Sequence, residues 1–221
     1  MESKGKKIVA VIDLGSTAIR MVVAEIGPDQ QWRIIDRAGK PVLLGRDVFS
    51  SGNVSRESLI QALKILSDFR EIINGWGIEQ NNIHVIATSA LREARNRDTF
   101  IDRVLIKTGF SIEVVEGIEE NRLTYIAVQH AMEELRPQLG RSNSLIIEVG
   151  GGSTEIMLLQ RSRIVASHSL NIGTVRIEQD VPTAATPDYR VKMLGERIGT
   201  MTEILDNELE MKRIRLFIAV G

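Results

Sequence analysis

Short apolar runs separated by turn residues open the chain. Runs at 7–13, 18–26 and 31–38 predict three consecutive strands, and Gly27-Pro28-Asp29 supplies the turn between the second and the third. Strands joined by such short turns pair with their neighbours in sequence. The pattern therefore predicts an antiparallel meander.

Helical spacing replaces the strand pattern after Ser55, which is a candidate helix N-cap. The apolar residues behind it recur over about five turns: Leu59, Leu63, Leu66, Phe69 and Ile73. A run at 83–88 then predicts a buried strand, 90–106 a helix and 112–115 another strand. The first half thus changes from a meander to strand–helix alternation.

The second half restarts the first. A long helix is predicted at 119–135, where Leu123, Ile126, Ala127, His130 and Ala131 mark its apolar face and Pro137 follows its end. A second meander, a helix and a last strand come next, at 144–149, 154–159, 163–170, 190–210 and 214–220.

The restart predicts two related domains, 1–125 and 126–221. Because a strand occupies the last positions, we expect the second domain to be incomplete, with further sequence normally following.

One phrase occurs at the start of both halves. Ile12-Asp13-Leu14-Gly15-Ser16-Thr17 has its counterpart in Ile147-Glu148-Val149-Gly150-Gly151-Gly152-Ser153-Thr154, and each lies between two apolar runs. Each predicts a hairpin in which a strand ends in an acid and glycine and hydroxyl residues form the turn. Backbone N–H groups and a carboxylate placed together suit a phosphate with a metal ion or a water. We expect the two copies to be equivalent parts of two domains that face one another.

Composition excludes several functions. The 221 residues are 43% hydrophobic, enough for one large or two small cores. With 28 basic and 29 acidic residues the net charge is −1, which argues against nucleic acid or a membrane surface as partner. The absence of cysteine excludes disulfides and cysteine-based zinc sites. The apolar stretch at 8–12 is too short for a signal peptide, so a cytoplasmic protein is expected.

Five strings in order carry a family resemblance: Ile12-Asp13-Leu14-Gly15-Ser16, Ala87-Thr88-Ser89-Ala90-Leu91-Arg92, Glu119-Glu120-Asn121-Arg122-Leu123, Gly150-Gly151-Gly152-Ser153-Thr154-Glu155 and Ser169-Leu170-Asn171-Ile172-Gly173-Thr174-Val175-Arg176. Nearly the whole chain resembles the exopolyphosphatase / guanosine pentaphosphate phosphohydrolase (Ppx/GppA) family. The resemblance implies an α/β fold: the duplicated ribonuclease-H-like architecture of actin, sugar kinases and heat-shock ATPases, with two domains around a cleft.

The resemblance also implies an activity. The family uses a divalent metal such as Mg²⁺ to hydrolyse the terminal phosphoanhydride of polyphosphate or guanosine pentaphosphate in that cleft. Such a reaction needs charge stabilisation and a water aimed by a carboxylate. Glu120, the second acid of its string and placed at a helix start, is the expected base, and Arg92 the expected fixed cation. The expected phosphate-binding residues are Gly15, Ser16, Thr17, Gly150, Gly151, Gly152 and Ser153.

Asp13 and Glu148 correspond to the family's two strand-end acids, which hold the metal or order water. Glu155 is either a further ligand or a solvated strand residue. Arg122 and Arg176 either face the cleft or make structural pairs.

Two positions depart from the family pattern. Glu148 stands where Asp is usual, so its carboxylate projects about 1–1.5 Å further, and in-line sites are sensitive to such shifts. The metal then sits deeper, or metal binding weakens, or activity is lost. Ser16-Thr17-Ala18 stands where Ser-Asn-Ser is usual, which removes one amide side chain.

Three functions stay open. The leading one is the phosphohydrolase. The departures at Glu148 and at the first turn motivate a module that binds polyphosphate or guanosine tetra- or pentaphosphate without hydrolysis. A sugar or acetate kinase of the same superfamily fits the Glu-Glu-x-Arg-Leu string less well. Since full-length relatives are often dimers, a homodimer is the expected assembly.

Overall fold

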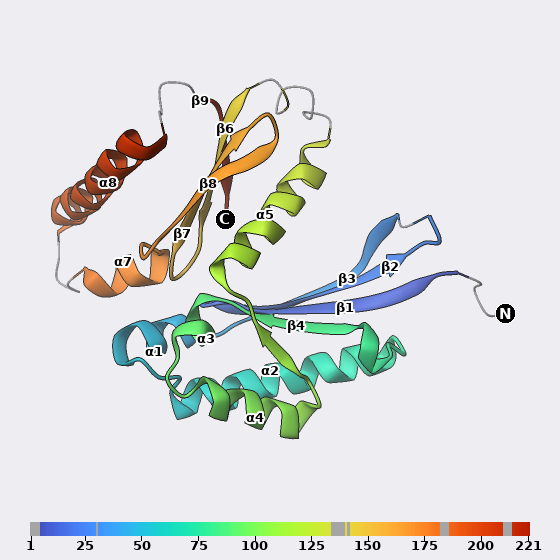
Figure 1. Ribbon diagram of the computed structural model, residues 1–221. Helices are drawn as coiled ribbons and strands as arrows, with labels where there is room; N and C mark the ends of the chain where they lie inside the picture. Colours follow the sequence, from blue (N-terminus) through green and yellow to red (C-terminus); the bar gives the residue numbers. More distant parts are fainter. Residues whose placement is uncertain (1–4, 30, 134–139, 141, 182–185, 210–213) are drawn as a thin grey trace. The chain divides into compact units, whose positions relative to one another are not determined.

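The computed structural model describes residues 5–29, 31–133, 140, 142–181, 186–209 and 214–221 (Figure 1). The contacts divide the chain into two compact units, residues 1–116 and 117–221. The division falls at the first residue of helix α5 (Gly117–Ala131), whereas the sequence placed the boundary inside that helix. It falls there because Val128 of α5 packs with the strands of the second unit.

The first unit contains a five-stranded sheet of order β3-β2-β1-β4-β5. Its strands are β1 (Lys7–Leu14), β2 (Ala18–Ile26), β3 (Trp32–Pro41), β4 (Ile83–Ala87) and β5 (Ile112–Val114). The first three strands are antiparallel, which confirms the meander, and β4 and β5 add to it in parallel. Because β1 and β4 run in the same direction, with Leu14 opposite Ala87, both strands end at one edge of the sheet.

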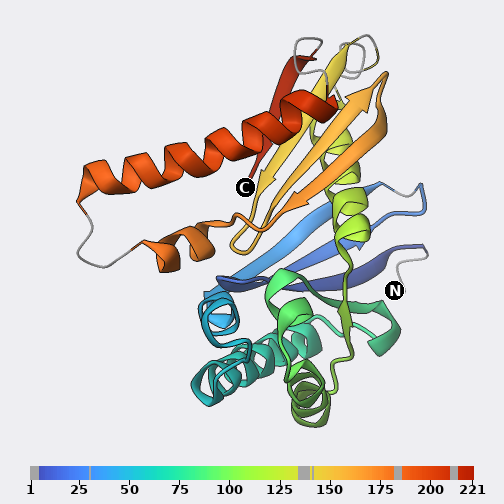
Figure 2. The same cartoon turned by 60° about the vertical axis from the view of Figure 1, so that its left-hand side comes forward.

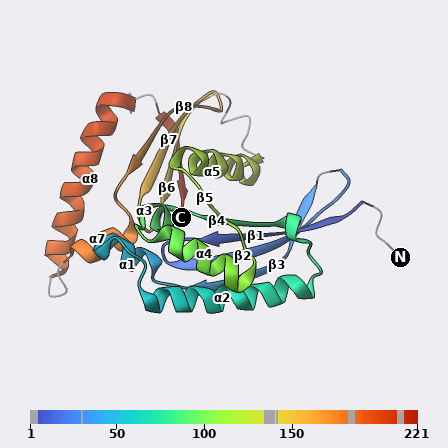
Figure 3. The ribbon, with the colours of Figure 1, turned by 60° about the horizontal axis from the view of Figure 1, so that its bottom comes forward.

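Helices α2 (Arg56–Gly75) and α4 (Arg97–Thr108) cover one face of this sheet (Figure 3). Ser55 caps α2 as predicted, since its Oγ accepts a hydrogen bond from the Ser58 N–H at 3.1 Å. Alternate β1 residues and the inner faces of both helices form one buried core, which includes Ala10, Ile12, Leu14, Leu66, Phe69, Ile73, Phe100 and Val104.

The sequence pattern did not identify two short helices, α1 (Leu44–Ser51) and α3 (Ser89–Glu93). Helix α1 follows β3, in a segment for which no element was predicted. The helix expected at 90–106 is two helices, α3 and α4. They are separate because Ala94, just after α3, adopts an extended conformation. Asn96 then precedes α4 and anchors the break: its side chain accepts from the Val54 N–H and donates to the Val54 carbonyl, both at 2.9 Å.

The second unit repeats the strand order of the first. Its four-stranded sheet runs β8-β7-β6-β9, built from β6 (Asn143–Val149), β7 (Thr154–Gln160), β8 (Arg163–Leu170) and β9 (Ile214–Val220) (Figure 2). The pairs β6–β7 and β7–β8 are antiparallel, and β6–β9 is parallel. This is the arrangement of β3-β2-β1-β4, which confirms the duplication predicted from the repeated phrase.

Helix α5 packs on the second sheet through a face that the apolar pattern did not indicate. Tyr125 and Val128 contact the buried Ile146 and Met157, whereas the predicted core positions Leu123 and Ile126 are 38% and 46% exposed. Polar residues face the sheet: the Tyr125 hydroxyl donates to the Ser162 carbonyl in the β7–β8 turn. Apolar periodicity therefore located the helix but gave the wrong buried face.

Two further helices follow β8. Helix α7 (Thr174–Asp180) was not predicted, and α8 (Pro187–Leu209) was expected at 190–210. Within the residues that the structure describes, no helix combines the length and the apolar character needed to cross a membrane.

Candidate functional site

The β1–β2 turn places Asp13 at the end of β1 and closes through a hydrogen bond from the Gly15 N–H to the Ala18 carbonyl at 3.0 Å. Asp13 lies opposite Arg20 in the hairpin, with 3.8 Å between Asp13 Oδ2 and Arg20 Nη1. Both side chains are partly exposed, so this ion pair fixes the Asp13 carboxylate only weakly. The expected metal ligand of the first unit therefore stays accessible.

Ser16 and Ser89 join the turn to the adjacent strand end. Because β1 and β4 end at the same edge, the turn lies beside the start of α3, and the two buried hydroxyls share a hydrogen bond of 3.0 Å. The Ser16 hydroxyl is thus engaged inside the fold. What Ser16 can offer a phosphate is its backbone amide, as the sequence analysis expected.

Arg92 is held at this edge of the first unit. Its backbone N–H bonds to the Thr88 carbonyl at 3.0 Å in the first turn of α3, and its Nη1 donates to the Val115 carbonyl at 2.6 Å, just after β5. A guanidinium is a rigid plane with five donors, so one short bond orients the rest. The string that carries Arg92 meets the turn of the first string through the Ser16–Ser89 hydrogen bond.

The β6–β7 turn has the geometry of the first. The Gly150 N–H bonds to the Ser153 carbonyl at 2.9 Å, as the Gly15 N–H does to the Ala18 carbonyl. Each turn is also backed by a helix start that contains a glycine. A Cβ on Gly45 of α1 would lie 2.6 Å from the Ser16 Cβ, and a Cβ on Gly173, before α7, would lie 2.3 Å from the Gly151 carbonyl oxygen.

Glu148 and Glu155 lie directly opposite each other on β6 and β7, so their carboxylates share one face of the second sheet. Glu155 is 2% exposed, and its Oε1 accepts from the Ser169 hydroxyl at 2.6 Å. Its Oε2 is buried without a partner among the described residues. Since a buried anionic oxygen is costly to leave unpaired, this atom points to a ligand that supplies positive charge or a donor. Of the two interpretations of Glu155, a solvated strand residue is wrong.

Thr124 ties helix α5 to this pair of acids. Its hydroxyl donates to Glu148 Oε2 at 2.6 Å. Glu120 lies four residues earlier, in the first turn of α5, so it occupies the same face of the helix as Thr124. The second unit therefore brings three of the predicted residues, Glu120, Glu148 and Glu155, toward one end of its sheet.

The neighbouring acid, Glu119, has a different role. Arg122 donates two hydrogen bonds to it, at 2.7 and 2.8 Å, one turn along the exposed side of α5. The hydrogen bond from Arg122 lowers the pKa of Glu119, and the same pairing raises the pKa of Arg122. Arg122 thus makes the structural pair that the sequence left as one of two alternatives.

The donor set of the second unit fits Mg²⁺. This ion is usually held by one or two carboxylates together with waters and substrate phosphates. Glu148 and Glu155 offer two carboxylates from paired positions on neighbouring strands. One of their oxygens, Glu155 Oε2, is buried and has no partner among the described residues. Asp13 belongs to the other unit. Over the described ranges, no cluster of three or more His, Asp or Glu side chains forms a ready-made cage.

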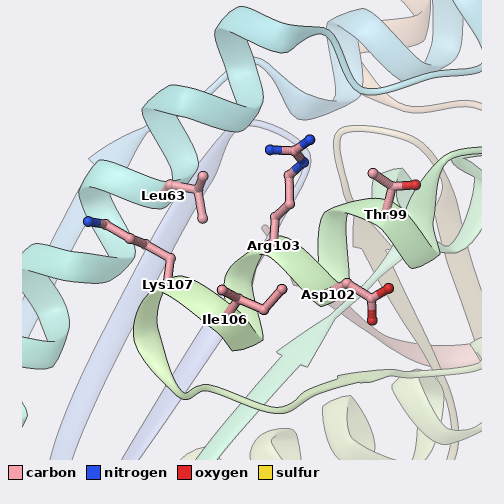
Figure 4. A pocket seen from close by; sticks show the side chains of 6 residues that line it. All are labelled: Leu63, Thr99, Asp102, Arg103, Ile106 and Lys107. Atoms are coloured by element: carbon pink, nitrogen blue, oxygen red, sulfur yellow. The ribbon is translucent and has the colours of Figure 1, made fainter.

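A surface hollow between α2 and α4 contains none of the predicted site residues (Figure 4). It is lined by Leu63, Thr99, Asp102, Arg103, Ile106 and Lys107. Its charges are mixed and its lining comes from the outer faces of two helices, so it contributes nothing to the phosphate chemistry.

Sequence reasoning missed four residues that hold the site. Thr124 and Ser169 bind the two acids, and Gly45 and Gly173 let a helix start approach each turn. Three of the four lie in or beside strings that carried the resemblance. The available signal was a glycine shortly after the third strand of each meander, Gly45 and Gly173.

The model of the Ppx/GppA phosphatase family matches residues 22–214. The chain is 33% identical over 174 residues to a bifunctional 3-dehydroquinate synthase/phosphatase of Fusobacterium nucleatum, covering 77% of this chain and 26% of that protein. It is 30% identical over 216 residues to exopolyphosphatase 2 of Mycobacterium tuberculosis, covering 91% and 65%. It is 29% identical over 174 residues to a guanosine-5'-triphosphate,3'-diphosphate pyrophosphatase of Pseudoalteromonas atlantica, covering 79% and 33%.

Solved structures agree on the fold. A Ppx/GppA family member from Aquifex aeolicus superposes with a TM-score of 0.72 at 26% identity, covering 98% of this chain and 66% of that one. An exopolyphosphatase from Cytophaga hutchinsonii gives 0.83 at 24% identity, covering 96% and 66%. The chain thus spans two thirds or less of the length of each of these proteins. The matched range, the repeated strand order and the five strings agree, and the chain belongs to the Ppx/GppA phosphatase family.

Proposed function

We propose that this chain is the catalytic part of a metal-dependent phosphohydrolase that releases the terminal phosphate of inorganic polyphosphate or guanosine pentaphosphate. The observation that carries the proposal is the carboxylate pair Glu148 and Glu155, tied through Thr124 to the helix that Glu120 helps to begin. Relatives named exopolyphosphatase and guanosine-5'-triphosphate,3'-diphosphate pyrophosphatase support the substrate class.

Glu120 acts as the general base. It accepts a proton from a water molecule as the water oxygen attacks the terminal phosphorus, and the bond from phosphorus to the bridging oxygen breaks. The products are inorganic phosphate and a chain shorter by one phosphate. Glu120 suits this role better than Glu119 because of its place on the helix: it shares a face of α5 with Thr124, which bonds to Glu148. Glu119 is paired with Arg122.

The transition state spreads negative charge over the phosphoryl oxygens, so positioned donors do most of the work. Arg92 supplies a guanidinium that the Val115 carbonyl holds in place. The amides of the two turns, at Gly15 to Thr17 and at Gly150 to Ser153, supply neutral donors.

Mg²⁺ is the proposed cofactor, with Glu148 and Glu155 as its ligands in the second unit. When bound, the ion neutralises phosphate oxygens of the substrate. Ser169 and Thr124 hold the two glutamates for this task.

Phosphate release by the purified chain tests the proposal. Long-chain polyphosphate and guanosine pentaphosphate are incubated separately with Mg²⁺, and again with excess EDTA. The proposal predicts phosphate release from at least one of the two substrates and none with EDTA. No release from either substrate would contradict the hydrolase.

A second candidate function is favoured by Glu148, the longer acid at a position where the family usually has Asp. A module that binds guanosine tetra- or pentaphosphate, or polyphosphate, without turnover would keep the turns and lose only the alignment of the metal. Micromolar binding in calorimetry without phosphate release would support this function, and absence of binding would remove it.

A further inference from the structure

Helix α7 docks onto the β6–β7 turn through three successive carbonyls. The Thr174 N–H bonds to the Gly150 carbonyl at 3.0 Å, and the Val175 N–H bonds to the Gly151 carbonyl at 2.9 Å. The third bond comes from a side chain, since Arg176 Nε donates to the Gly152 carbonyl at 2.6 Å. The turn carbonyls thereby satisfy N–H groups in the first turn of α7, which have no partner within the helix.

Gly173 permits this close approach. A Cβ at this position would lie 2.3 to 2.5 Å from backbone atoms of Gly151 and Gly152, a distance that no side-chain adjustment relieves. The Thr154 hydroxyl adds a bond to the Ile172 carbonyl at 2.5 Å from the other side of the turn. The turn and the start of α7 are therefore fitted to each other.

The bonded carbonyls determine where the turn amides point. In a trans peptide the C=O of one residue and the N–H of the next lie in one plane and point in opposite directions. Carbonyls of Gly150, Gly151 and Gly152 that are directed at α7 therefore direct the N–H groups of Gly151, Gly152 and Ser153 away from it. Successive N–H groups on one side of a turn form a concave site for an anion.

We propose that Arg176 is a positioning residue that sets the orientation of the Gly152–Ser153 peptide in this phosphate-binding turn. The inference rests on the proposed function, because it assumes that the turn amides bind the substrate phosphate. The Arg176 guanidinium acts through the Gly152 carbonyl and does not contact the phosphate. This assigns Arg176 the structural one of the two roles that the sequence left open.

The first unit uses a related arrangement without such a side chain. There the Val42 and Gly45 N–H groups bond to the Thr17 and Ser16 carbonyls at 2.9 and 2.8 Å. Both donors are backbone groups, which a change of side chain leaves in place unless the new residue is proline. In the second unit one donor is a side chain, so the orientation of its turn can be tested by mutation.

Three substitutions separate positioning from charge. In Arg176→Gln the amide Nε2 stands the same number of bonds from the backbone as Nε of arginine, so the donor to Gly152 is kept and the charge is lost. In Arg176→Met the side chain has a similar length, but both the hydrogen-bond donor and the charge are lost. In Arg176→Lys the charge is kept but the donor is displaced. Arg163→Met, on an exposed residue at the far end of β8, controls for the loss of one positive charge.

Calorimetric binding of tripolyphosphate to the full chain in Mg²⁺ is the first measurement. The proposal predicts that Arg176→Met weakens binding by about tenfold and that Arg176→Gln stays within about threefold of the wild-type chain. If the guanidinium contacted the phosphate directly, Arg176→Gln would bind as weakly as Arg176→Met while Arg176→Lys kept its affinity. That result would overturn the proposal, as would unchanged binding by Arg176→Met.

Backbone amide resonances of the ligand-free chain give a second readout that needs no substrate. The signals of Gly152 and Ser153 are expected to coincide in the wild-type chain and Arg176→Gln and to shift in Arg176→Met. Coincident signals in all three would overturn the positioning role. Failure of the wild-type chain to bind tripolyphosphate would instead count against the proposed function, and the resonances would still decide the role of Arg176.

Discussion

The Thr124 hydroxyl donates a hydrogen bond to Glu148 Oε2 at 2.6 Å, which joins helix α5 to the end of β6. Glu148 is one methylene longer than Asp13, its counterpart in the first repeated phrase, and the bond fixes where the extra length goes. The same helix carries Glu120 one turn earlier. One turn of α5 therefore links the orientation of Glu148, the proposed metal ligand, to that of Glu120, the proposed base.

Removing the Thr124 hydroxyl should impair catalysis more than folding. In Thr124→Val the shape is kept but Glu148 loses its donor, and a hydrogen bond to a charged group contributes about 1.5–3 kcal/mol. A carboxylate displaced by about 1 Å can cost up to about a hundredfold in rate. We expect the kcat for phosphate release to fall by at least about tenfold, and Thr124→Ser, which keeps the hydroxyl, to restore most of it.

A double-mutant cycle with Glu148→Asp separates the hydrogen bond from general damage. The shorter Asp does not reach Thr124, so Thr124→Val should have little further effect on kcat in the Glu148→Asp background. Kinetic measurements on the four chains give the coupling energy. Equal effects of Thr124→Val in both backgrounds would show that the hydroxyl does not act through Glu148.

Gly45 should tolerate no side chain. A Cβ there would lie 2.6 Å from the Ser16 Cβ and 2.9 Å from Phe49 Cε2, so Gly45→Ala overpacks the contact between α1 and the turn. We expect the free energy of unfolding to fall by about 1–3 kcal/mol in urea titrations. Gly75→Ala is the matched control, because Gly75 is also helical and an added methyl there would meet no described atom within 4 Å. It should stabilise by up to about 1 kcal/mol.

Asp47 should make the first unit sensitive to acid. Burial raises the pKa of Asp47, but hydrogen bonds from Ser55 and Ser58 outweigh it and hold the pKa below its ordinary value. A lowered pKa in the folded state contributes stability above the unfolded value of about 3.9, and that contribution is lost as the pH falls through the folded pKa.

Urea unfolding between about pH 5 and pH 3 tests this dependence. The free energy of unfolding should decline more steeply with falling pH in the wild-type chain than in Asp47→Asn, which cannot change its charge. Parallel curves for the wild-type chain and Asp47→Asn would contradict the role given to Asp47.

The two meanders could be anticipated from the sequence because Gly27-Pro28-Asp29 marks a turn and the acid–glycine phrase occurs twice. The buried face of α5 could not. Thr124 and Tyr125 face the sheet because they have specific hydrogen-bond partners on it, Glu148 and the Ser162 carbonyl. Such a face does not appear in apolar periodicity, which instead selected Leu123 and Ile126.

The candidate site, like the fold, could be predicted from the sequence only in part. Glu120 and Arg92 could be named from the strings that contain them, and Glu148 from the repeated phrase. The contacts of Thr124, Ser169 and Arg176 could not be foreseen, because they join segments far apart in the sequence. Burial excluded the solvated alternative for Glu155: a strand position that alternation leaves ambiguous is 2% exposed and carries an oxygen without a partner in the described part of the chain.

A comparison of two neighbouring glutamates tests whether Glu120 activates the attacking water. Phosphate release from polyphosphate is measured with Mg²⁺ for the wild-type chain, Glu120→Gln and Glu119→Gln, with binding of the same substrate measured in parallel. We expect a kcat at least about a hundredfold lower for Glu120→Gln with binding preserved, and near wild-type turnover for Glu119→Gln. Full turnover by Glu120→Gln would show that Glu120 is not the base.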